Sequence, residues 1–377
     1  MPRVDLDLSV EIERTPRVVQ VEGIFDVPEA KRQTVSMHFD APFDQRPWQI
    51  GLIVGPSGSG KSSVARHLFR EALVEGYEWH PSRSVVDGFG DLPVRDVTAA
   101  LSSVGFSSPP SWIKPYHVLS TGERFRATMA RALVDTRELI VIDEFTSVVD
   151  RTVARIGSSA VAKAIRRTPT KRFVAVSCHD DIVEWLQPDW ILEPHVGGFH
   201  WRSPQRRPAI ELEIVRVHHS AWRIFAPHHY LSASLHKSAA CFVALYEGIP
   251  VAFDAWLPFV GRLKNGRRGR RGHRTVCLPD YQGCGIGGAL FTTLASAWAG
   301  LGYVALSRTG HPAEIAQRQR SPEWSMTASY GFTTRDRGAL ASRRTSRCTH
   351  RRAASFRYVG PPMDRVQAAA LTGVSPI

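Results

Sequence analysis

Short apolar runs recur along the first half of the chain and predict buried strands. Residues 50–54 (Ile-Gly-Leu-Ile-Val) are apolar and largely β-branched, and residues 139–142 and 173–176 are similar runs. Residues 64–76 and 124–134 read as helices. The residues before the first run alternate between polar and apolar in places, which suggests further strands. This pattern predicts an α/β domain.

The pattern changes at residues 203–208 (Ser-Pro-Gln-Arg-Arg-Pro), a break rich in Pro and Arg. Beyond it, residues 210–217 alternate as a strand, and residues 225–231 carry a helical stretch. Residues 241–246 and 249–256 flank a Glu-Gly pair and predict a hairpin. We therefore predict a first domain at 1–202, a linker at 203–209, a second domain at 210–360 and a C-terminal tail at 361–377.

The composition is that of an ordinary soluble protein. At 377 residues, the chain is long enough for about two domains with separate cores. No apolar run approaches the ~20 residues of a membrane span, and the N-terminus lacks the apolar core of a signal peptide. Five cysteines at no metal-ligand spacing are typical of free thiols in a reducing compartment. We expect a cytoplasmic protein that does not associate with membranes.

The net charge of +13 is unusual and clustered. Residues 335–357 hold eight arginines against one acid, and residues 262–274 hold a second basic cluster. The second cluster consists of Arg262, Lys264, Arg267, Arg268, Arg270, Arg271 and Arg274. Such patches attract nucleic acid, such as DNA or tRNA, or another polyanion. The alternative is that they are solvated loops.

A glycine-rich loop follows the strand predicted at residues 50–54. It reads Gly55-Pro56-Ser57-Gly58-Ser59-Gly60-Lys61-Ser62-Ser63. This fits G-x-x-x-x-G-K-[ST], the phosphate-binding loop of nucleoside triphosphatases. Its glycines let backbone N–H groups close around phosphates at a helix N-terminus, where the dipole favours anions. Lys61 would reach the β- and γ-phosphates, and the Ser62 hydroxyl would bind Mg²⁺.

Further motifs follow in a specific order. They are Leu119-Ser120-Thr121-Gly122-Glu123, Asp143-Glu144 at the end of a strand, Thr146-Ser147-Val148-Val149-Asp150, and Ser177-Cys178-His179-Asp180 after another strand. An acid at the end of a buried strand can hold the water shell of a metal. A second carboxylate beside it can polarise an attacking water, and a nearby histidine can bond the γ-phosphate.

This order resembles the nucleotide-binding domain of the ABC-type ATPases, over about residues 15–202. The resemblance implies ATP and Mg²⁺ as ligands, with Walker A contacts in the phosphate loop. Asp143 would be the Walker B acid and would hold the metal together with Ser62. Glu144 would be the catalytic carboxylate, and His179 the switch histidine.

The resemblance also implies an ATP-dependent, head-to-tail homodimer. Ser120 and Gly122 would contact the γ-phosphate held by the second copy. Asp150 would lie in the loop that crosses the dimer interface.

The chain departs from the family pattern at several positions. Thr121 stands where the signature usually has Gly, Glu123 where Gln is common, and Phe145 where Pro usually follows the catalytic Glu. The Gln that normally reaches the metal is missing between the phosphate loop and the signature, and Asp87 is a candidate substitute. That segment is also short for a transporter-type domain. These departures favour a soluble ABC-class ATPase that works on nucleic acid or on an attached domain.

A second glycine-rich turn leads from a strand into a helix predicted at residues 289–299. It reads Gln282-Gly283-Cys284-Gly285-Ile286-Gly287-Gly288 and fits the Q/R-x-x-G-x-G/A motif of the GNAT acetyltransferases. The resemblance spans about residues 210–360 and implies a GNAT-like α+β domain. The amides of residues 283–288 would bind acetyl-CoA or another acyl-CoA, with its carbonyl over a splayed pair of strands.

A transfer of this kind also needs residues that move protons. The resemblance implies a general acid at Tyr330. No Glu lies on the strand before the turn as a plain general base. Asp254, His228 and His229 are candidates, and each can equally be structural.

The sequence therefore predicts an ATPase that gates acyl-CoA-dependent modification of nucleic acid. The basic cluster at 262–274, just before the turn's strand, would lie near the acceptor site. One rival is an N-acetyltransferase for proteins or small molecules with a regulatory ATPase. The other is an ATP-dependent nucleic-acid-binding protein whose GNAT fold is not catalytic.

Overall fold

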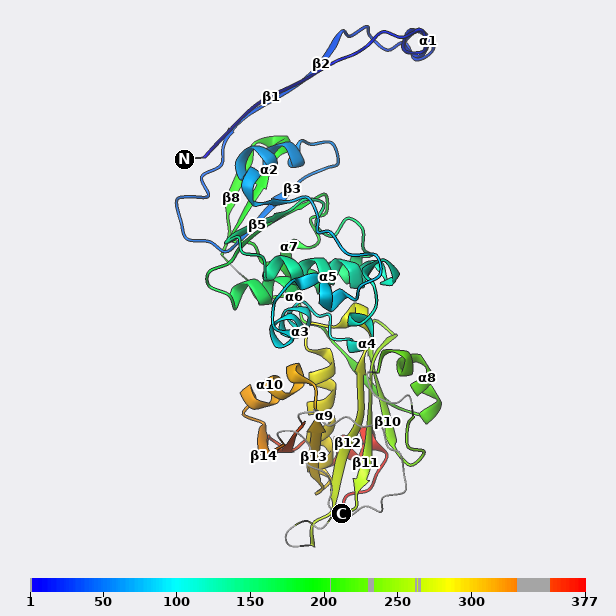
Figure 1. Cartoon of the computed structure of the whole chain (residues 1–377). Coiled ribbons are helices and arrows are strands. Elements are labelled where there is room, and N and C mark those ends of the chain that lie inside the picture. The colour runs from blue at the N-terminus through cyan, green and yellow to red at the C-terminus, as the bar shows by residue number, and fades with distance from the viewer. Residues whose placement is uncertain (1, 204, 230–233, 262, 264–265, 331–352) are drawn as a thin grey trace. The chain divides into compact units, whose positions relative to one another are not determined.

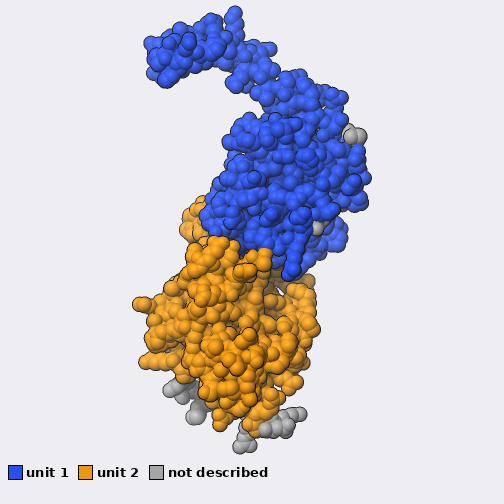
Figure 2. Space-filling model, turned by 180° about the vertical axis from the view of Figure 1, so that it is seen from behind, with its two compact units in different colours: residues 1–78, 131–208 blue, residues 79–130, 209–377 orange. Residues whose placement is uncertain are grey.

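The computed structural model describes residues 2–203, 205–229, 234–261, 263, 266–330 and 353–377 (Figure 1). Contacts divide the chain into two compact units, each built from two stretches of sequence. Unit 1 comprises residues 1–78 and 131–208, and unit 2 comprises residues 79–130 and 209–377 (Figure 2). The sequence analysis assigned residues 79–130 to the first domain, whereas these contacts group them with the second half of the chain.

Unit 1 is built on a six-stranded sheet in the order β4-β5-β6-β3-β7-β8. Its strands are β3 (Ile50–Val54), β4 (Leu73–Val74), β5 (Leu139–Ile142), β6 (Arg172–Ser177), β7 (Trp190–Glu193) and β8 (Gly198–Trp201). Neighbouring strands are parallel except β7 and β8. The helices are α2 (Lys61–Phe69), α6 (Arg151–Arg166) and α7 (Val183–Leu186). The α/β architecture predicted for this half is confirmed.

The central strand of this sheet is closely covered by an aromatic side chain. A Cβ on Gly51 would lie 2.0 Å from the Trp190 ring, so glycine lets the indole rest directly on β3. The Trp190 ring in turn stacks on Phe43. This packing buries β3 along its whole length and fixes the strand that leads into the phosphate loop.

The helix predicted over residues 64–76 is shorter in the structure. Helix α2 ends at Phe69, and a 3-10 turn (Arg70–Ala72) leads into β4. Residues Leu73–Val74 pair in parallel with β5, so sheet hydrogen bonds replace helical ones there.

The start of unit 1 forms a two-stranded antiparallel ribbon of β1 (Arg3–Glu11) and β2 (Arg32–Asp40). Helix α1 (Pro16–Phe25) connects the two strands and buries none of its residues. Of the two strands expected before the phosphate loop, the one at residues 35–39 is confirmed as part of β2. The one at residues 18–21 is wrong, because these residues lie in α1, which Thr15 caps and Pro16 begins.

The first stretch of unit 2 is helical. It contains α3 (Val94–Ser103), α4 (Pro109–Trp112) and most of α5 (Thr121–Leu133), whose last residues belong to unit 1. The rings of Trp79 and Tyr116 stack at 4.6 Å and fasten the start of this stretch to its middle.

The rest of unit 2 is a seven-stranded sheet in the order β14-β15-β13-β12-β11-β10-β9. The strands are β9 (Glu213–Val217), β10 (Ala240–Tyr246), β11 (Ile249–Phe259), β12 (Gly269–Cys277), β13 (Val304–Thr309), β14 (Trp324–Tyr330) and β15 (Ala353–Tyr358). The helices are α8 (Trp222–Phe225), α9 (Ile286–Gly300), α10 (Pro312–Arg320) and α11 (Arg365–Thr372). The predicted helical stretch at 225–231 corresponds to α8 and a 3-10 turn that ends at His228.

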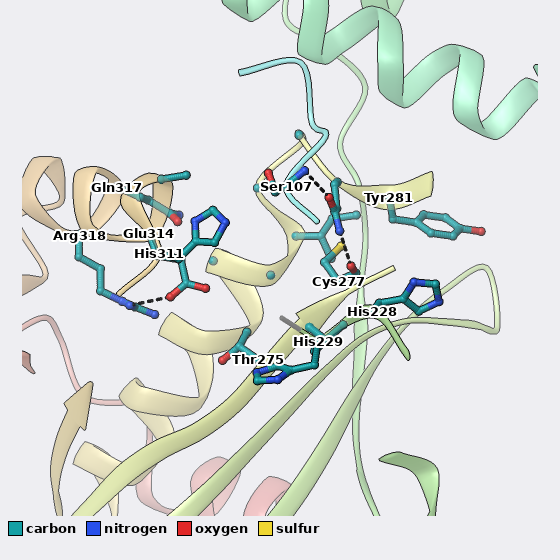
Figure 3. Close-up of a pocket in the computed structure, with 18 residues that line it drawn as sticks. Ser107, His228, His229, Thr275, Cys277, Tyr281, His311, Glu314, Gln317 and Arg318 are labelled. Carbon is teal, nitrogen blue, oxygen red and sulfur yellow. Dashed lines mark hydrogen bonds and ion pairs between the residues drawn. The ribbon is translucent and has the colours of Figure 1, made fainter. Parts of the chain in front are cut away.

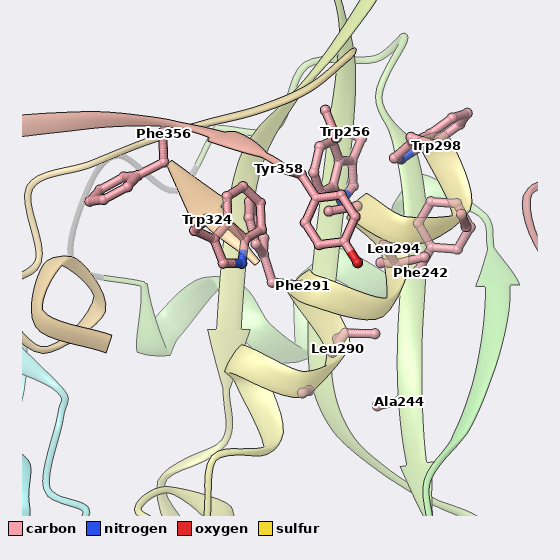
Figure 4. Packing of buried hydrophobic residues seen from close by; sticks show 14 of the residues in the cluster. Phe242, Ala244, Trp256, Leu290, Phe291, Leu294, Trp298, Trp324, Phe356 and Tyr358 are labelled. Carbon is pink, nitrogen blue, oxygen red and sulfur yellow. The ribbon is translucent and has the colours of Figure 1, made fainter. Parts of the chain in front are cut away.

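The predicted hairpin is β10 and β11. Its two loop residues, Glu247 and Gly248, have φ of 50° and 78°, the combination that a type I′ turn requires. The sheet buries apolar side chains on both faces. On the α9 face, Trp256 stacks on Phe291 at 4.8 Å, with Trp298 nearby (Figure 4).

One pair of neighbouring strands in this sheet diverges. β12 and β13 are parallel and pair only where Gly269–Arg271 faces Val304–Leu306. Farther along, β12 continues on β11 to Cys277, while β13 continues on β15 to Thr309. Their C-terminal halves therefore separate, and the chain between them forms α9.

The segment set aside by sequence as a C-terminal tail is packed into unit 2. Helix α11 contacts α9 and β9, and Ala368 on it is fully buried. The Arg216 guanidinium donates to the carbonyl of Thr372 at 2.6 Å. These contacts make residues 361–377 part of the core rather than an appendage.

Candidate functional site

The phosphate loop of unit 1 has the geometry of an open anion cradle. Gly58 and Gly60 have φ of 77° and 80°, in the left-handed region that favours glycine. Gly60 caps α2 without any side-chain hydrogen bond, so the first N–H groups of the helix remain available to a ligand. Lys61 donates from Nζ to the carbonyl of Pro56 at 2.6 Å and thus lies along the loop.

The serines of the loop differ in their exposure. Ser57 is exposed, while Ser62 and Ser63 are the second and third residues of α2 and are half-buried. The Ser59 hydroxyl is buried and, among the described residues, has no hydrogen-bond partner. A Cβ on Gly55 would lie 3.0 Å from that hydroxyl and 2.9 Å from His195 Nδ1. Sequence analysis missed His195, because only the fold places it beside the loop.

The catalytic candidates follow strands that end at the same edge of the sheet. Val54 of β3 is level with Ser177 of β6, and Ile142 of β5 is level with Ala175 of β6. The loop, Asp143-Glu144 and His179 each follow one of these strands. Because the strands are parallel and about 4.8 Å apart, the three groups share one edge. The structure thus brings together residues that are far apart in sequence.

The turn that carries Glu144 is held in a strained conformation. Glu144 and Thr146 have φ of 51° and 68°, in a region that non-glycine residues rarely adopt. The Phe145 N–H donates to the carbonyl of Val176 at 2.8 Å, and the Phe145 ring packs edge to face on Phe173. Proline, the usual residue at this position in the ABC family, has no N–H and could not make this hydrogen bond. Glu144 itself is exposed.

Asp150 and Asp143 each accept local backbone hydrogen bonds. Asp150 is the N-cap of α6 and accepts from the N–H groups of Thr152 and Val153 at 2.9 and 3.0 Å. Asp143 accepts from the Glu144 N–H at 2.9 Å. The role of Asp150 at a dimer interface stays a prediction.

The signature residues in unit 2 form the start of α5. Ser120 Oγ accepts from the Glu123 N–H at 3.2 Å, and Glu123 accepts from the Ser120 N–H at 3.0 Å. This reciprocal pair is a capping box, in which Glu and Gln serve equally well. Ser120 is exposed and Gly122 is buried. Asp87, the candidate substitute for the missing Gln, likewise accepts from the N–H of Ser84 at 3.2 Å.

The second glycine-rich turn lines a cavity of about 180 Å³ in unit 2 (Figure 3). Gly283 and Gly285 have φ of 97° and 93°, and Gly285 caps α9 without a side-chain hydrogen bond. A Cβ on Gly285 would meet nothing within 4 Å. Ile286 is buried, and Cys284 is half-buried. The N-terminus of α9 therefore opens into the cavity, as the anion-binding prediction requires.

Gln282, the first residue of the motif and a predicted cofactor-binding residue, makes two hydrogen bonds within the protein. Its side-chain Oε1 accepts from the Ser107 N–H at 2.8 Å, and its Nε2 donates to the Cys277 carbonyl at 2.8 Å. The amide is thus engaged in holding the turn. At the other end of the motif, a Cβ on Gly288 would lie 2.0 Å from Gln317 Nε2, so α10 covers this glycine.

Polar side chains that sequence analysis missed line the opposite wall of the cavity. Glu314 and Arg318 on α10 form an ion pair at 3.1 Å, and the Arg318 guanidinium lies over the Phe291 ring at 4.3 Å. Burial would raise the pKa of Glu314, but Arg318 and the nearby His311 lower it overall. Only the tertiary structure brings α10 beside the glycine turn.

The three candidate bases differ in their access to this cavity. His228 and His229 line it, and burial lowers the pKa of His228. Asp254 is fully buried behind Thr275, and burial raises its pKa to about 7. Tyr330 is the last residue of β14, and its side chain lies outside the described residues, as does Gly331-Phe332.

The described arginines of the 262–274 cluster differ in their distance along the chain from this cavity. Arg270 lies over the Trp298 and Tyr303 rings at 4.5 and 5.0 Å. It precedes Thr275 by five residues on β12, about 16 Å of extended strand. Arg274 of the same cluster, by contrast, directly precedes Thr275, which lines the cavity. The expectation that the 262–274 cluster lies near the acceptor site stays a prediction. Nearly all of the arginine cluster at 335–357 lies outside the described residues.

Curated proteins with similar sequences are ATP-binding proteins of ABC systems. A zinc import ATP-binding protein of Cereibacter sphaeroides is 33% identical over 167 residues, covering 37% of this chain and 65% of the relative. An ATP-dependent lipid A-core flippase of Pseudomonas syringae pv. tomato is 27% identical over 186 residues, covering 38% of this chain and 30% of the relative. The chain carries an ABC-type nucleotide-binding domain. It spans less than two thirds of the length of these relatives.

Other comparisons add little to this ABC assignment. No family model matches the chain. A dimeric ATP-binding cassette bound to ADP and Pi aligns with 45% of this chain and 92% of its own, at 14% identity and a TM-score of 0.36. Part of an ABC transporter complex of Clostridium perfringens aligns with 46% of this chain and 81% of its own length, at 19% identity and a TM-score of 0.32. Among the described residues, no helix is long and apolar enough to cross a membrane.

Proposed function

We propose that the chain binds and hydrolyses ATP at the phosphate loop of unit 1. Lys61 and the N–H groups at the start of α2 would bind the phosphates. Ser62 and Asp143 offer the oxygen ligands that Mg²⁺ prefers, and the ion would neutralise phosphate charge during transfer. Glu144 would accept a proton from the attacking water, and His179 would bond the γ-phosphate. The shared sheet edge of these groups supports the proposal.

ATP binding would bring two copies of the chain together head to tail. Ser120 and Gly122 would contact the nucleotide of the second copy, with Asp150 at the interface. Analytical ultracentrifugation of Glu144→Gln with and without ATP tests this association. A monomer under both conditions would contradict it.

We further propose that unit 2 binds an acyl-CoA, such as acetyl-CoA, and transfers its acyl group to an acceptor. The observation that carries this proposal is the glycine turn, whose open helix N-terminus lies where β12 and β13 diverge. The α9 amides would bind the pyrophosphate. The thioester carbonyl would lie between the separated strands, in agreement with the GNAT resemblance of the sequence.

The cavity supplies the groups that such a transfer needs. The nucleophile of the acceptor would attack the thioester carbonyl, the C–S bond would break, and coenzyme A would leave as its thiol after protonation. His228 or His229 would take the proton of the nucleophile, because both line the cavity. Tyr330 would protonate the leaving thiolate. A structural role for either histidine would leave the pH profile of transfer unchanged after His→Gln substitution.

The acceptor that the net charge favours is nucleic acid, DNA or tRNA. A charge of +13 attracts polyanions. If several phosphates are contacted, affinity should fall steeply with salt. If the chain does not bind nucleic acid, or binds it with an affinity that does not depend on salt, a protein or small-molecule acceptor is favoured instead.

A titration of the purified full chain with acetyl-CoA, followed by labelled transfer to DNA, tRNA and protein with and without ATP, tests the proposed function. We expect saturable binding and label on nucleic acid that increases with ATP. ATPase activity without acetyl-CoA binding would contradict the transferase. It would leave an ATP-dependent binding protein with a non-catalytic second unit, or a subunit that serves a transport system, as the names of the relatives suggest.

A further inference from the structure

The helical stretch that carries the ABC signature also builds part of the proposed acyl-CoA cavity. Ser107, between α3 and α4, lines that cavity together with the glycine turn (Figure 3). A Cβ on Gly105 would lie 2.5 Å from the carbonyl of Gln282, so the two backbones are in close contact. The stretch 79–130 therefore contributes to the lining of this pocket through Ser107, within unit 2.

Two hydrogen bonds fasten the turn to this stretch and to the sheet. The Ser107 N–H donates to Gln282, which in turn donates to the carbonyl of Cys277 at the end of β12. The three residues form a continuous chain from the loop after α3, through the turn, to the strand. A shift of the loop must therefore move Gln282 or break one of the bonds.

A buried arginine on the signature helix makes a further connection. Arg126 lies on α5, six residues after Ser120, and is fully buried. Its Nη2 donates to the carbonyl of Asp280 at 2.8 Å, and its Nη1 lies 3.9 Å from an Asp280 carboxylate oxygen. Asp280 belongs to the 3-10 turn (Pro279–Tyr281) that leads directly into the glycine turn.

Such a buried guanidinium is a specific connection rather than general packing. Burial lowers the pKa of Arg126, with partial compensation from Asp280. Among the described residues, its Nε and Nη1 have no hydrogen-bond partner. A buried cation with so few hydrogen-bond partners destabilises the fold relative to an apolar side chain of similar volume. Packing alone therefore does not account for an arginine at this position.

We propose that Arg126 is a positioning residue that couples the nucleotide state of the signature helix to the acyl-CoA turn. The inference rests on the proposed function of both units. When ATP and a second copy engage Ser120, the N-terminal turn of α5 is held in one position. Arg126 transmits that position to Asp280, and Gln282 adjusts the α9 amides that bind the pyrophosphate. Acyl-CoA affinity then depends on ATP, and ATP affinity depends equally on acyl-CoA.

Calorimetric titration of the full chain with acetyl-CoA, with and without ATP, measures this coupling. The experiment is carried out in the Glu144→Gln background so that ATP persists. We expect ATP to change the dissociation constant of acetyl-CoA by at least about fivefold, the low end of common allosteric coupling. In Arg126→Met the change should fall below about twofold, while each ligand still binds alone.

Arg124→Met is the matched control, because Arg124 lies on the same helix and is exposed, and its side chain donates to the carbonyl of Leu119 rather than to the glycine turn. It should retain the parental coupling. If Arg126→Met does not fold, Gln282→Glu tests the same path, since it keeps the acceptor for Ser107 but loses the donor to Cys277. It should also abolish coupling.

The outcomes separate the inference from the proposed function. Failure of the parent to bind acetyl-CoA would overturn the transferase and this inference with it. Binding of both ligands without any mutual effect would overturn the inference alone. Full coupling in Arg126→Met, or in Gln282→Glu where only that variant folds, would overturn the role of this connection.

Discussion

The carboxylate of Asp254 accepts a hydrogen bond from the hydroxyl of Thr275 at 2.8 Å, and Thr275 lines the cavity of unit 2. The second carboxylate oxygen accepts from Trp256 Nε1 at 2.7 Å. Both bonds hold an acid that has no exposure to solvent. The hydrogen bond from Asp254 toward the cavity thus passes through a side chain that cannot act as a base at neutral pH.

Asp254→Asn should flatten the dependence of stability on pH. The pKa of this carboxyl rises from 3.8 to about 7 on folding, chiefly because of burial. The folded state thus binds a proton that the unfolded state has released, and stability falls as pH rises from about 4 to 7. The slope approaches about 1.4 kcal/mol per pH unit. Urea unfolding of parent and variant at pH 5 and pH 7.5 measures it, and identical pH dependence would contradict the assigned pKa.

Gly287→Asp should prevent acetyl-CoA binding and leave ATPase activity intact. A carboxylate at the start of α9 would face the pyrophosphate, and repulsion of up to about 4 kcal/mol would weaken binding by a hundredfold or more. Gly287→Ala is the control, because its Cβ would lie 3.6 Å from Cys277 in ordinary contact. Calorimetry with acetyl-CoA should show loss of binding in the first variant only. Equal affinities would remove the glycine turn from the ligand site.

Glu144→Gln should lower ATP hydrolysis by about a hundredfold or more while ATP still binds, because general-base catalysis typically contributes 10² to 10⁴. Glu138→Gln makes the same charge change at an exposed residue just before β5 and should retain the parental rate. Phosphate release at saturating ATP measures both. An active Glu144→Gln variant would exclude this carboxylate as the catalytic base.

Phe145→Pro, the change toward the usual ABC sequence, should destabilise unit 1. It removes the N–H that donates to Val176 and the buried ring that packs on Phe173. Loss of a buried aromatic ring alone costs about 3–5 kcal/mol. Phe145→Leu keeps the N–H and most of the apolar volume, so it should unfold at a temperature much closer to the parent. Equal melting temperatures for Phe145→Pro and the parent would show that neither the hydrogen bond nor the ring stabilises unit 1.

Several features could be predicted from sequence because they depend on local chemistry. The strand at 50–54 and the loop after it require apolar residues, glycines and a lysine at fixed spacing, and the structure has them as β3 and the start of α2. The hairpin was predicted because two apolar runs flank the Glu-Gly pair at 247–248, and the structure has them as β10 and β11. The predicted end of this helix at residue 76 was wrong, because Leu73–Val74 pairs with a strand more than sixty residues away.

The sequence by itself determined the two glycine-rich turns, the order of the ABC motifs and the strands and helices around them, since each depends on neighbouring residues. Only the tertiary structure decided which groups meet. It placed His195 beside Gly55, brought Glu314 and Arg318 to the cavity at the second glycine-rich turn, and buried Arg126 against the turn at Asp280. It also made the C-terminal segment part of a core. These pairings follow from the burial of large apolar faces between distant segments, which no local pattern encodes.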